Sequence, residues 1–261
     1  MRQHFPTEFV YQVFSLLIAF ILVHALYVTL IRPQAEVFLE REAAQLQADP
    51  AYVPQRSFYV VIKDYEQEAC FVLMLWAFSI LGYKGRAAWR QQKLLEQDLL
   101  QLPDNLPVGP EDTRGLIARL QSLPAPLQDY LLPRALLSAV ERFNATRNVQ
   151  NVSTAARDLC DSEGERLESE LSTIRYIAWA IPSVGFIGTV RGIGDALGQA
   201  HRAVEGDITG VTASLGVAFN STFIALVISI VLMFFIHQLQ LMQERLVLDS
   251  ERYVDRWLVR R

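Results

Sequence analysis

Four long stretches of the chain are almost free of charged residues, and their lengths indicate the class of protein. The first, residues 9–31, has 23 residues without Lys, Arg, Asp or Glu, and about 20 apolar residues cross the hydrocarbon core of a bilayer. The second is residues 69–83, the third is 176–197, and the fourth, 211–236, has no charged residue. We therefore predict an all-α membrane protein with four spanning helices.

The first two runs each have an alternative interpretation. The first is longer than the apolar core of a cleaved signal peptide, so we expect it to remain as an anchor. The second has only 15 residues, and a buried helix of a soluble domain is its alternative. Long polar side chains at the flanks can extend a short span, and we prefer a span here as well.

Basic residues beside the spans predict the orientation of the chain. Lys and Arg follow the second run at 84–93 and the fourth run at 245–261, whereas 32–68 carries seven acids against four bases. Cytoplasmic flanks are enriched in Lys and Arg. We therefore expect 32–68 to lie outside and both termini to lie in the cytoplasm.

This layout divides the chain into six parts. They are an N-terminal transmembrane anchor (1–31), a periplasmic segment (32–68), the second transmembrane helix (69–83), a helical cytoplasmic domain (84–175), the pair formed by the third and fourth spans (176–237), and a cytoplasmic C-terminal helix (238–261). No strand-like alternation occurs in 84–175. Within it Ser153 is the expected N-cap of a long helix. In the tail, which we expect to continue the fourth span as a helix, Ser250 interrupts an otherwise apolar helical face.

Composition excludes several other classes of protein. The chain is 51% hydrophobic and 20% charged, and its mean hydropathy is +0.19, which is too apolar for a disordered chain. Two cysteines far apart do not make a disulfide scaffold. With 24 basic and 28 acidic residues and no basic block, nucleic-acid binding is not expected.

Catalytic and metal-binding patterns are absent from the sequence. The four histidines stand apart, and neither HExxH nor CxxC occurs. The glycine-rich stretch 185–194 lacks GxxxxGK[ST], and no strand precedes it, so a nucleotide loop is not supported. We expect neither an enzyme nor a cofactor.

The glycines of the third span are better explained by helix packing. Small residues four positions apart let helix backbones approach closely in lipid. Two such pairs are Gly188 with Gly192 and Gly194 with Gly198, and Gly185 shares the face of the first pair. Pro182 lies within the same span, where it removes one backbone hydrogen bond and is expected to kink the helix.

Polar residues inside the third and fourth spans are the candidates for an ion path. Thr189 lies in the third span, Asn220, Ser221 and Thr222 lie in the fourth, and Ser229 shares the helical face of Thr222. A lone hydroxyl in a membrane helix often bonds only to its own backbone. Three consecutive polar residues with a polar partner on the next span favour a wetted cavity or an ion path.

Three ionisable residues near or inside the spans need partners. Arg191 and Asp195 are four residues apart near the outer end of the third span, and we predict that they pair at the outer mouth. His24 lies within the first span. A functional ionisable group is one interpretation of His24, and a neutral imidazole hydrogen-bonded to a neighbouring helix is the preferred one.

Two motifs in these spans resemble a known family. Residues 181–193, IPSVGFIGTVRGI, resemble the MotA/TolQ/ExbB proton-channel family, whose penultimate span carries a similar GxxGTVxGI pattern. Residues 218–227, AFNSTFIALV, are similar to its last span. The chain departs from the family at Arg191, where an aromatic residue is frequent, at Ala225, where glycine is common, and at Ser229, where a proline-containing segment is common.

The resemblance, which covers about residues 176–237, implies an assembly and a mechanism. It implies a homopentameric ring in the bacterial inner membrane around a dimer of a single-span partner, with ion flow along their interface moving the partner. Thr189 and Thr222 take the positions of the family's two pore threonines. A non-conducting scaffold and a membrane-anchored sensor that uses 84–175 are the alternatives.

The two pore spans lack a group that carries a proton. Residues 177–190 and 211–236 contain no Asp, Glu, Lys, Arg or His, and a threonine hydroxyl does not titrate near neutral pH. We therefore expect the ring to be an incomplete proton channel. The missing carboxylate would be an Asp in the membrane span of the partner, which also carries a periplasmic domain.

Overall fold

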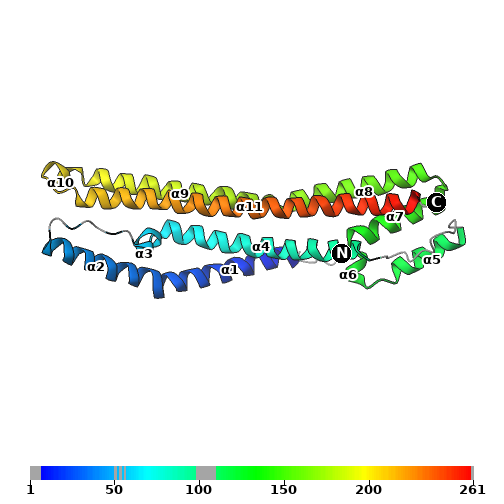
Figure 1. Cartoon of the computed structure of the whole chain (residues 1–261), viewed down its shortest axis with the longest axis horizontal. Coiled ribbons are helices and arrows are strands. Elements are labelled where there is room, and N and C mark those ends of the chain that lie inside the picture. The colour runs from blue at the N-terminus through cyan, green and yellow to red at the C-terminus, as the bar shows by residue number, and fades with distance from the viewer. Residues whose placement is uncertain (1–6, 50–51, 53–54, 56, 98–109, 260–261) are drawn as a thin grey trace. The chain divides into compact units, whose positions relative to one another are not determined.

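The computed structural model describes residues 7–49, 52, 55, 57–97 and 110–259, and these residues form helices but no strand (Figure 1). The helices are α1 (Thr7–Leu26), the π-helical η1 (Tyr27–Ile31), α2 (Arg32–Ala48), α3 (Phe58–Ile62), α4 (Tyr65–Leu95), α5 (Pro110–Gln121), α6 (Ala125–Gln128), α7 (Leu131–Thr146), α8 (Val149–Glu170), α9 (Ser172–Gly198), α10 (Ala200–Val204) and α11 (Thr209–Val259). Four helical stretches are long and apolar enough to cross a membrane. The predicted all-α membrane fold with four spans is therefore confirmed.

Contacts divide the chain into two compact units. The first combines residues 1–81 with 173–235, and the second combines 82–172 with 236–261. The first unit holds α1 to α3, the start of α4, most of α9, and α10 with the start of α11. It therefore contains nearly all of the four apolar runs. The second unit holds α5 to α8 with the ends of α4 and α11.

The first apolar run belongs to a helix that extends far beyond it. α1, η1 and α2 follow one another without a break, although Pro33 lies two residues after the end of the run. The π turn of η1 precedes this proline, and the backbone N–H of Arg32 bonds to the carbonyl of Tyr27. The buried residues of this helix stand at every fourth position, namely Ser15, Ala19, Val23, Tyr27, Ile31 and Ala35. Most other side chains of α1 are large, apolar and exposed, as in a helix that faces lipid.

The second span begins earlier than its apolar run. α4 starts at Tyr65, so Glu66, Gln67 and Glu68 form its first turn. Gln67 and Glu68 are buried. Hydropathy alone places these residues outside a span, because it scores each residue without the polar partners that contact it from other helices.

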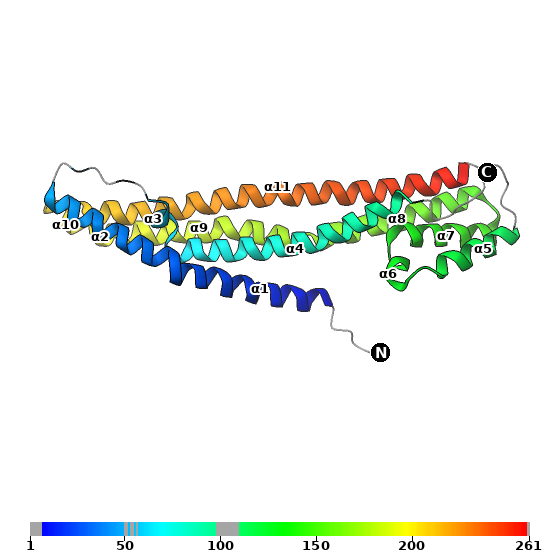
Figure 2. The ribbon, with the colours of Figure 1, turned by 60° about the horizontal axis from the view of Figure 1, so that its bottom comes forward.

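The last two long helices lie side by side in the first unit (Figures 1 and 2). The short α10 joins them, and the turn after it uses Gly206 at φ 98°, a left-handed conformation that favours glycine. α9 continues through Pro182, and α11 continues through Ser250 into the second unit. The Oγ of Ser250 is buried and donates to the carbonyl of Leu246 at 2.7 Å, so this polar residue is satisfied within the helix.

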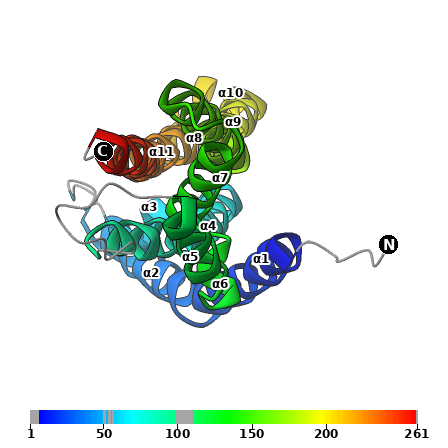
Figure 3. The ribbon, with the colours of Figure 1, turned by 90° about the vertical axis from the view of Figure 1, so that its right-hand side faces the viewer.

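The second unit is a helical bundle with its own core. α7 packs against both α8 and α5 and lies between them in the end-on view (Figure 3). The core consists of Leu116, Leu120, Leu131, Leu132, Ala135, Leu136, Ala139, Val140, Val152, Ala156, Cys160 and Val254. The N-cap predicted at Ser153 is wrong. Arg147 ends α7 in a left-handed conformation, and the Asn148 side chain then caps α8 by accepting from the backbone N–H of Gln150 at 2.9 Å.

Candidate functional site

Three glycines let the backbone of α9 lie directly against α11. A Cβ on Gly188 would lie 2.5 Å from the Cβ of Ser221, and a Cβ on Gly192 would lie 2.7 Å from the carbonyl oxygen of Ser214. A Cβ on Gly185 would also overlap a side chain of α11. No larger residue fits at these distances, so the three glycines set the spacing of the two helices.

Gly194 and Gly198 differ from these three. No atom of the described residues lies within 4 Å of a Cβ built at either position. The close seam between α9 and α11 is therefore formed by one glycine face of α9, and the second pair of glycines is not part of it within a single chain.

The hydroxyls of Thr189 and Thr222 are in hydrogen-bond contact across this seam. The Oγ1 of Thr189 lies 3.1 Å from the carbonyl oxygen of Ala218, and the Oγ1 of Thr222 lies 3.2 Å from that of Gly185. Each hydroxyl has one proton to donate and lone pairs that accept. Either threonine can therefore donate to the other while its partner donates to the backbone. The pair has two hydrogen-bond arrangements that interconvert by hydroxyl rotation.

Ser221 lies on a different side of α11 from Thr222. Successive residues of an α-helix are about 100° apart, so Asn220, Ser221 and Thr222 do not share a face. Ser221 is 1% exposed, donates to the carbonyl of Val217 at 2.9 Å and accepts from the Nε2 of Gln67 at 3.3 Å. Its side chain is thus used in the packing of α11 against α4. Of the three polar residues, Thr222 is the one that contacts the hydroxyl on α9.

Ser229 completes the backbone hydrogen bonding of α9. Pro182 has no N–H to offer the carbonyl of Ala178, four residues earlier. The Oγ of Ser229 donates to that carbonyl from α11 at 3.1 Å. Because the orphaned acceptor is satisfied in this way, α9 stays helical through the proline. The spacing of Ser229 from Thr222 did not indicate this contact.

Arg191 forms ion pairs with two acids. Its Nε and Nη2 lie 2.7 and 2.8 Å from the two carboxylate oxygens of Glu66 on α4, which is a bidentate pair. Its Nη1 lies 3.7 Å from the Oδ2 of Asp195, the predicted partner on the same helix. The pair with Glu66 joins residues 125 positions apart, and the sequence pattern did not predict it.

The first turn of α4 joins the other long helices of the first unit. Glu66 binds α9 and Gln67 binds α11, as described above. Glu68 binds the first helix, because its Oε1 lies 2.6 Å from the Nδ1 of His24 and its other oxygen pairs with Arg32. His24 therefore has a polar partner on a neighbouring helix. One signal for these pairs was available in the sequence, since every charge in or beside a span requires a counter-charge.

A broad apolar surface lies beside the threonine pair. Positions three or four residues from Thr189 and Thr222 share their side of each helix. Large exposed side chains at and around such positions are Phe186, Val190, Ile193, Phe219, Phe223 and Leu226. A patch of this kind is covered by lipid or by another protein.

The described residues hold no group of three His, Cys, Asp or Glu arranged for a metal ion. Both cysteines are buried and free. Burial raises the pKa of the Cys160 thiol, in the second unit, to about 12, so the thiol stays protonated and unreactive near neutral pH.

Residues 128–252 match the MotA/TolQ/ExbB proton channel family. The match includes α7 to α10 and most of α11, and so contains both threonines and the glycine face of α9. This part of the chain belongs to that family, and the resemblance found in the two motifs is confirmed. No curated protein and no solved structure was found to match the chain.

Together with the four apolar helices, this match identifies a multi-pass membrane protein. Members of the family are channel and motor subunits, which gives the general class of function as an ion-driven motor subunit.

Proposed function

We propose that this chain forms the ring of a proton-driven motor in the bacterial inner membrane, with both termini in the cytoplasm. Five copies surround a dimer of a single-span partner that carries an intramembrane Asp and a periplasmic domain. Protons pass along the interface between ring and partner, and their flow moves the partner. The contact between Thr189 and Thr222 is the single observation on which this function rests.

The threonine pair has the properties of a proton-relay element. The two hydroxyls lie in the stretches 177–190 and 211–236, which contain no charged residue, and they exchange donor and acceptor roles by rotation alone. Such a pair orders water and passes on a hydrogen bond, but it does not store a proton. A titratable group next to it is therefore required.

Glu66 and Glu68, two carboxylates in the first turn of α4, are paired with cations. Glu66 holds Arg191, and Glu68 holds Arg32 and His24. Both carboxylates are thus used to hold other helices of the first unit. This supports an Asp on the partner as the group that binds and releases protons opposite the threonine pair.

The function is tested by removing one hydroxyl. Thr222→Val is nearly isosteric and deletes one bridging hydrogen bond, worth about 1.4 kcal/mol or a factor of about ten in rate. We expect proton flux through vesicles that contain ring and partner to fall about tenfold, with the ring intact by native mass spectrometry. Thr212→Val is the matched control, because Thr212 is on the same helix and its hydroxyl bonds to the carbonyls of Ile208 and Thr209, at the start of that helix.

Two results would contradict the proposal. Full flux in Thr222→Val with normal ring assembly would remove the threonine pair from the proton path. Proton flux through the purified ring without any partner would show that this chain carries its own titratable group, and would exclude a carboxylate supplied by the partner.

A further inference from the structure

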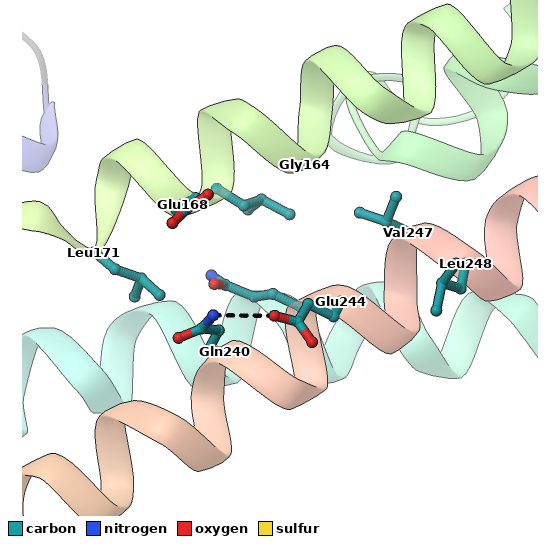
Figure 4. A pocket seen from close by; sticks show the side chains of 9 residues that line it. Gly164, Glu168, Leu171, Gln240, Glu244, Val247 and Leu248 are labelled. Atoms are coloured by element: carbon teal, nitrogen blue, oxygen red, sulfur yellow. Dashed lines mark hydrogen bonds between the residues drawn. The ribbon is translucent and has the colours of Figure 1, made fainter.

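A groove of about 390 Å³ runs between α8 and α11 in the second unit (Figure 4). Leu167, Leu171 and Val247 give it an apolar floor, and Glu168 and Glu244 line its sides. The Nε2 of Gln240, another lining residue, donates to the Oε1 of Glu244 at 3.0 Å (Figure 4). Gly164 leaves space above the floor, since no atom of the described residues lies within 4 Å of a Cβ at this position. The groove therefore has room for a large side chain and acidic sides that attract cations.

The same unit exposes a face with the opposite character. Arg86, Trp89, Arg90 and Lys93 of α4 are all exposed, and Trp89 is 53% exposed. Their spacing of i, i+3, i+4 and i+7 places them on one side of the helix. The Nζ of Lys93 lies 4.1 Å from the centre of the Trp89 ring. This basic face, with one aromatic residue in its middle, is opposite in charge to the two acids that line the groove.

The groove and the basic face lie at the same level along the unit. The Nζ of Lys84 lies 2.9 Å from the Oε2 of Glu170, and the Nε2 of Gln92 lies 3.1 Å from an oxygen of Asp249. These contacts align residues 84–92 of α4 with the end of α8 and with the part of α11 that lines the groove. In a cyclic ring whose axis runs along the helices, neighbouring copies meet at equal heights.

The two surfaces also lie on opposite sides of the unit. Glu170 faces α4, whereas Glu168 lines the groove, and two residues of a helix are about 200° apart. The basic face is the exposed side of α4, away from its contacts with α8 and α11. A groove on one side and a complementary face on the other is the arrangement that links copies head to tail into a ring.

We infer that the groove between α8 and α11 binds the basic face of α4 from the neighbouring copy of this chain. Trp89 enters the space above the apolar floor, and Arg86 and Arg90 pair with the acids that line the groove. This contact rests on the proposed function, because it requires the ring. It extends that function by giving the cytoplasmic part of each subunit a defined role in closing the ring.

Cross-linking in native membranes tests the contact in the full chain. Ala87→Cys with Leu248→Cys places one thiol beside the basic face and one in the groove, and both native cysteines are fully buried. With a short bis-maleimide we expect a ladder of cross-linked species up to the complete ring. Ala87→Cys with Ala118→Cys is the control, because Ala118 is exposed on α5 and does not line the groove.

A second variant fills the groove. Gly164→Leu has space in the chain's own fold, so we expect normal helicity and melting, but loss of the cross-link and a shift of the native mass spectrum to species smaller than the ring. Gly115→Leu, at another open position on a helix of the same unit, should keep the ring.

Three outcomes would overturn the inference. A complete ring without the Ala87–Leu248 cross-link would show that the groove is not the interface, and would leave the proposed function standing. Purified wild-type chain that is only monomeric would reject the ring and the groove contact together. If Arg86→Glu with Arg90→Glu removes co-purifying anionic lipid but leaves the cross-link unchanged, the basic face binds lipid headgroups instead.

Discussion

At the scale of single residues, hydroxyl groups of similar chemistry on α11 have three different partners. Thr222 bonds to a hydroxyl, Ser221 to the amide of Gln67, and Ser229 to a carbonyl that Pro182 leaves without a donor. Each partner lies on another helix, so the role of a hydroxyl depends on what faces it and not on its own chemistry. The sequence groups these residues as one polar cluster, and the structure separates them around the helix.

Glu163 leads to a prediction about stability in acid. Burial disfavours its charged form, but the hydrogen bonds and charges of Arg166 and Arg134 outweigh burial and hold the pKa of Glu163 below its ordinary value. The folded protein therefore binds this proton less readily than the unfolded chain. The stabilisation is complete above the unfolded pKa of about 4.3 and is lost as the pH falls through the lower folded pKa.

Thermal melting of the full chain in detergent between pH 7 and pH 3 measures this effect. We expect the melting temperature of wild type to fall below pH 4.3 or so. Glu163→Gln should melt lower than wild type at pH 7 and lose less on acidification. Glu165→Gln is the control, because Glu165 is exposed on the same helix. An unchanged acid dependence in Glu163→Gln would assign the effect to other carboxylates.

At the scale of helices, the seam between α9 and α11 and the first turn of α4 organise the first unit. The glycine face brings α9 and α11 into backbone contact. Glu66, Gln67 and Glu68 then connect α4 to each of the other long helices. The short apolar run 69–83 indicated the second span but not its start, because the first turn of α4 is polar and becomes buried only through these contacts.

The seam predicts opposite effects for two neighbouring glycines. Gly192→Ala forces a methyl group to within 2.7 Å of the Ser214 carbonyl oxygen, and overpacking of this kind costs about 1–3 kcal/mol. Gly194→Ala meets open space and should be neutral or gain about 0.5–1 kcal/mol from the helix preference of alanine. Unfolding of the purified chain in detergent measures both. Equal stability of the two variants would mean that the seam is looser than described.

At the scale of the whole molecule, the Lys and Arg residues after the second and fourth apolar runs predict that these flanks lie in the cytoplasm. The same rule predicts that residues 32–68, which carry more acids than bases, lie outside.

Labelling of single cysteines in intact cells tests the topology. Ala48→Cys, exposed at the end of α2, should react with a membrane-impermeant maleimide added from outside. Ala118→Cys, exposed on α5, should react only after the membrane is permeabilised. Reaction of Ala118→Cys in intact cells would overturn the orientation. Both native cysteines are buried and should stay unlabelled in folded protein.

The sequence by itself determined the number of spans, the all-α class and the family motifs. Crossing a bilayer requires a continuous apolar stretch whose backbone bonds are satisfied within one helix, and both properties are local in the chain. The glycine spacing and the threonines are local patterns too. Because the hydropathy signal is local in the chain, the apolar runs gave the approximate place of each span but not its ends.

Only the tertiary structure decided which polar groups meet. Arg191 pairs with Glu66 across 125 positions, and Ser221 lies against Gln67 across 154. These pairings depend on the rotation and the axial shift of one helix against another. A rotation of about 100°, one residue's turn, would bring Ser221 instead of Thr222 to the hydroxyl of Thr189. Packing sets that rotation through the glycine face of α9, and no pattern within a single helix specifies it.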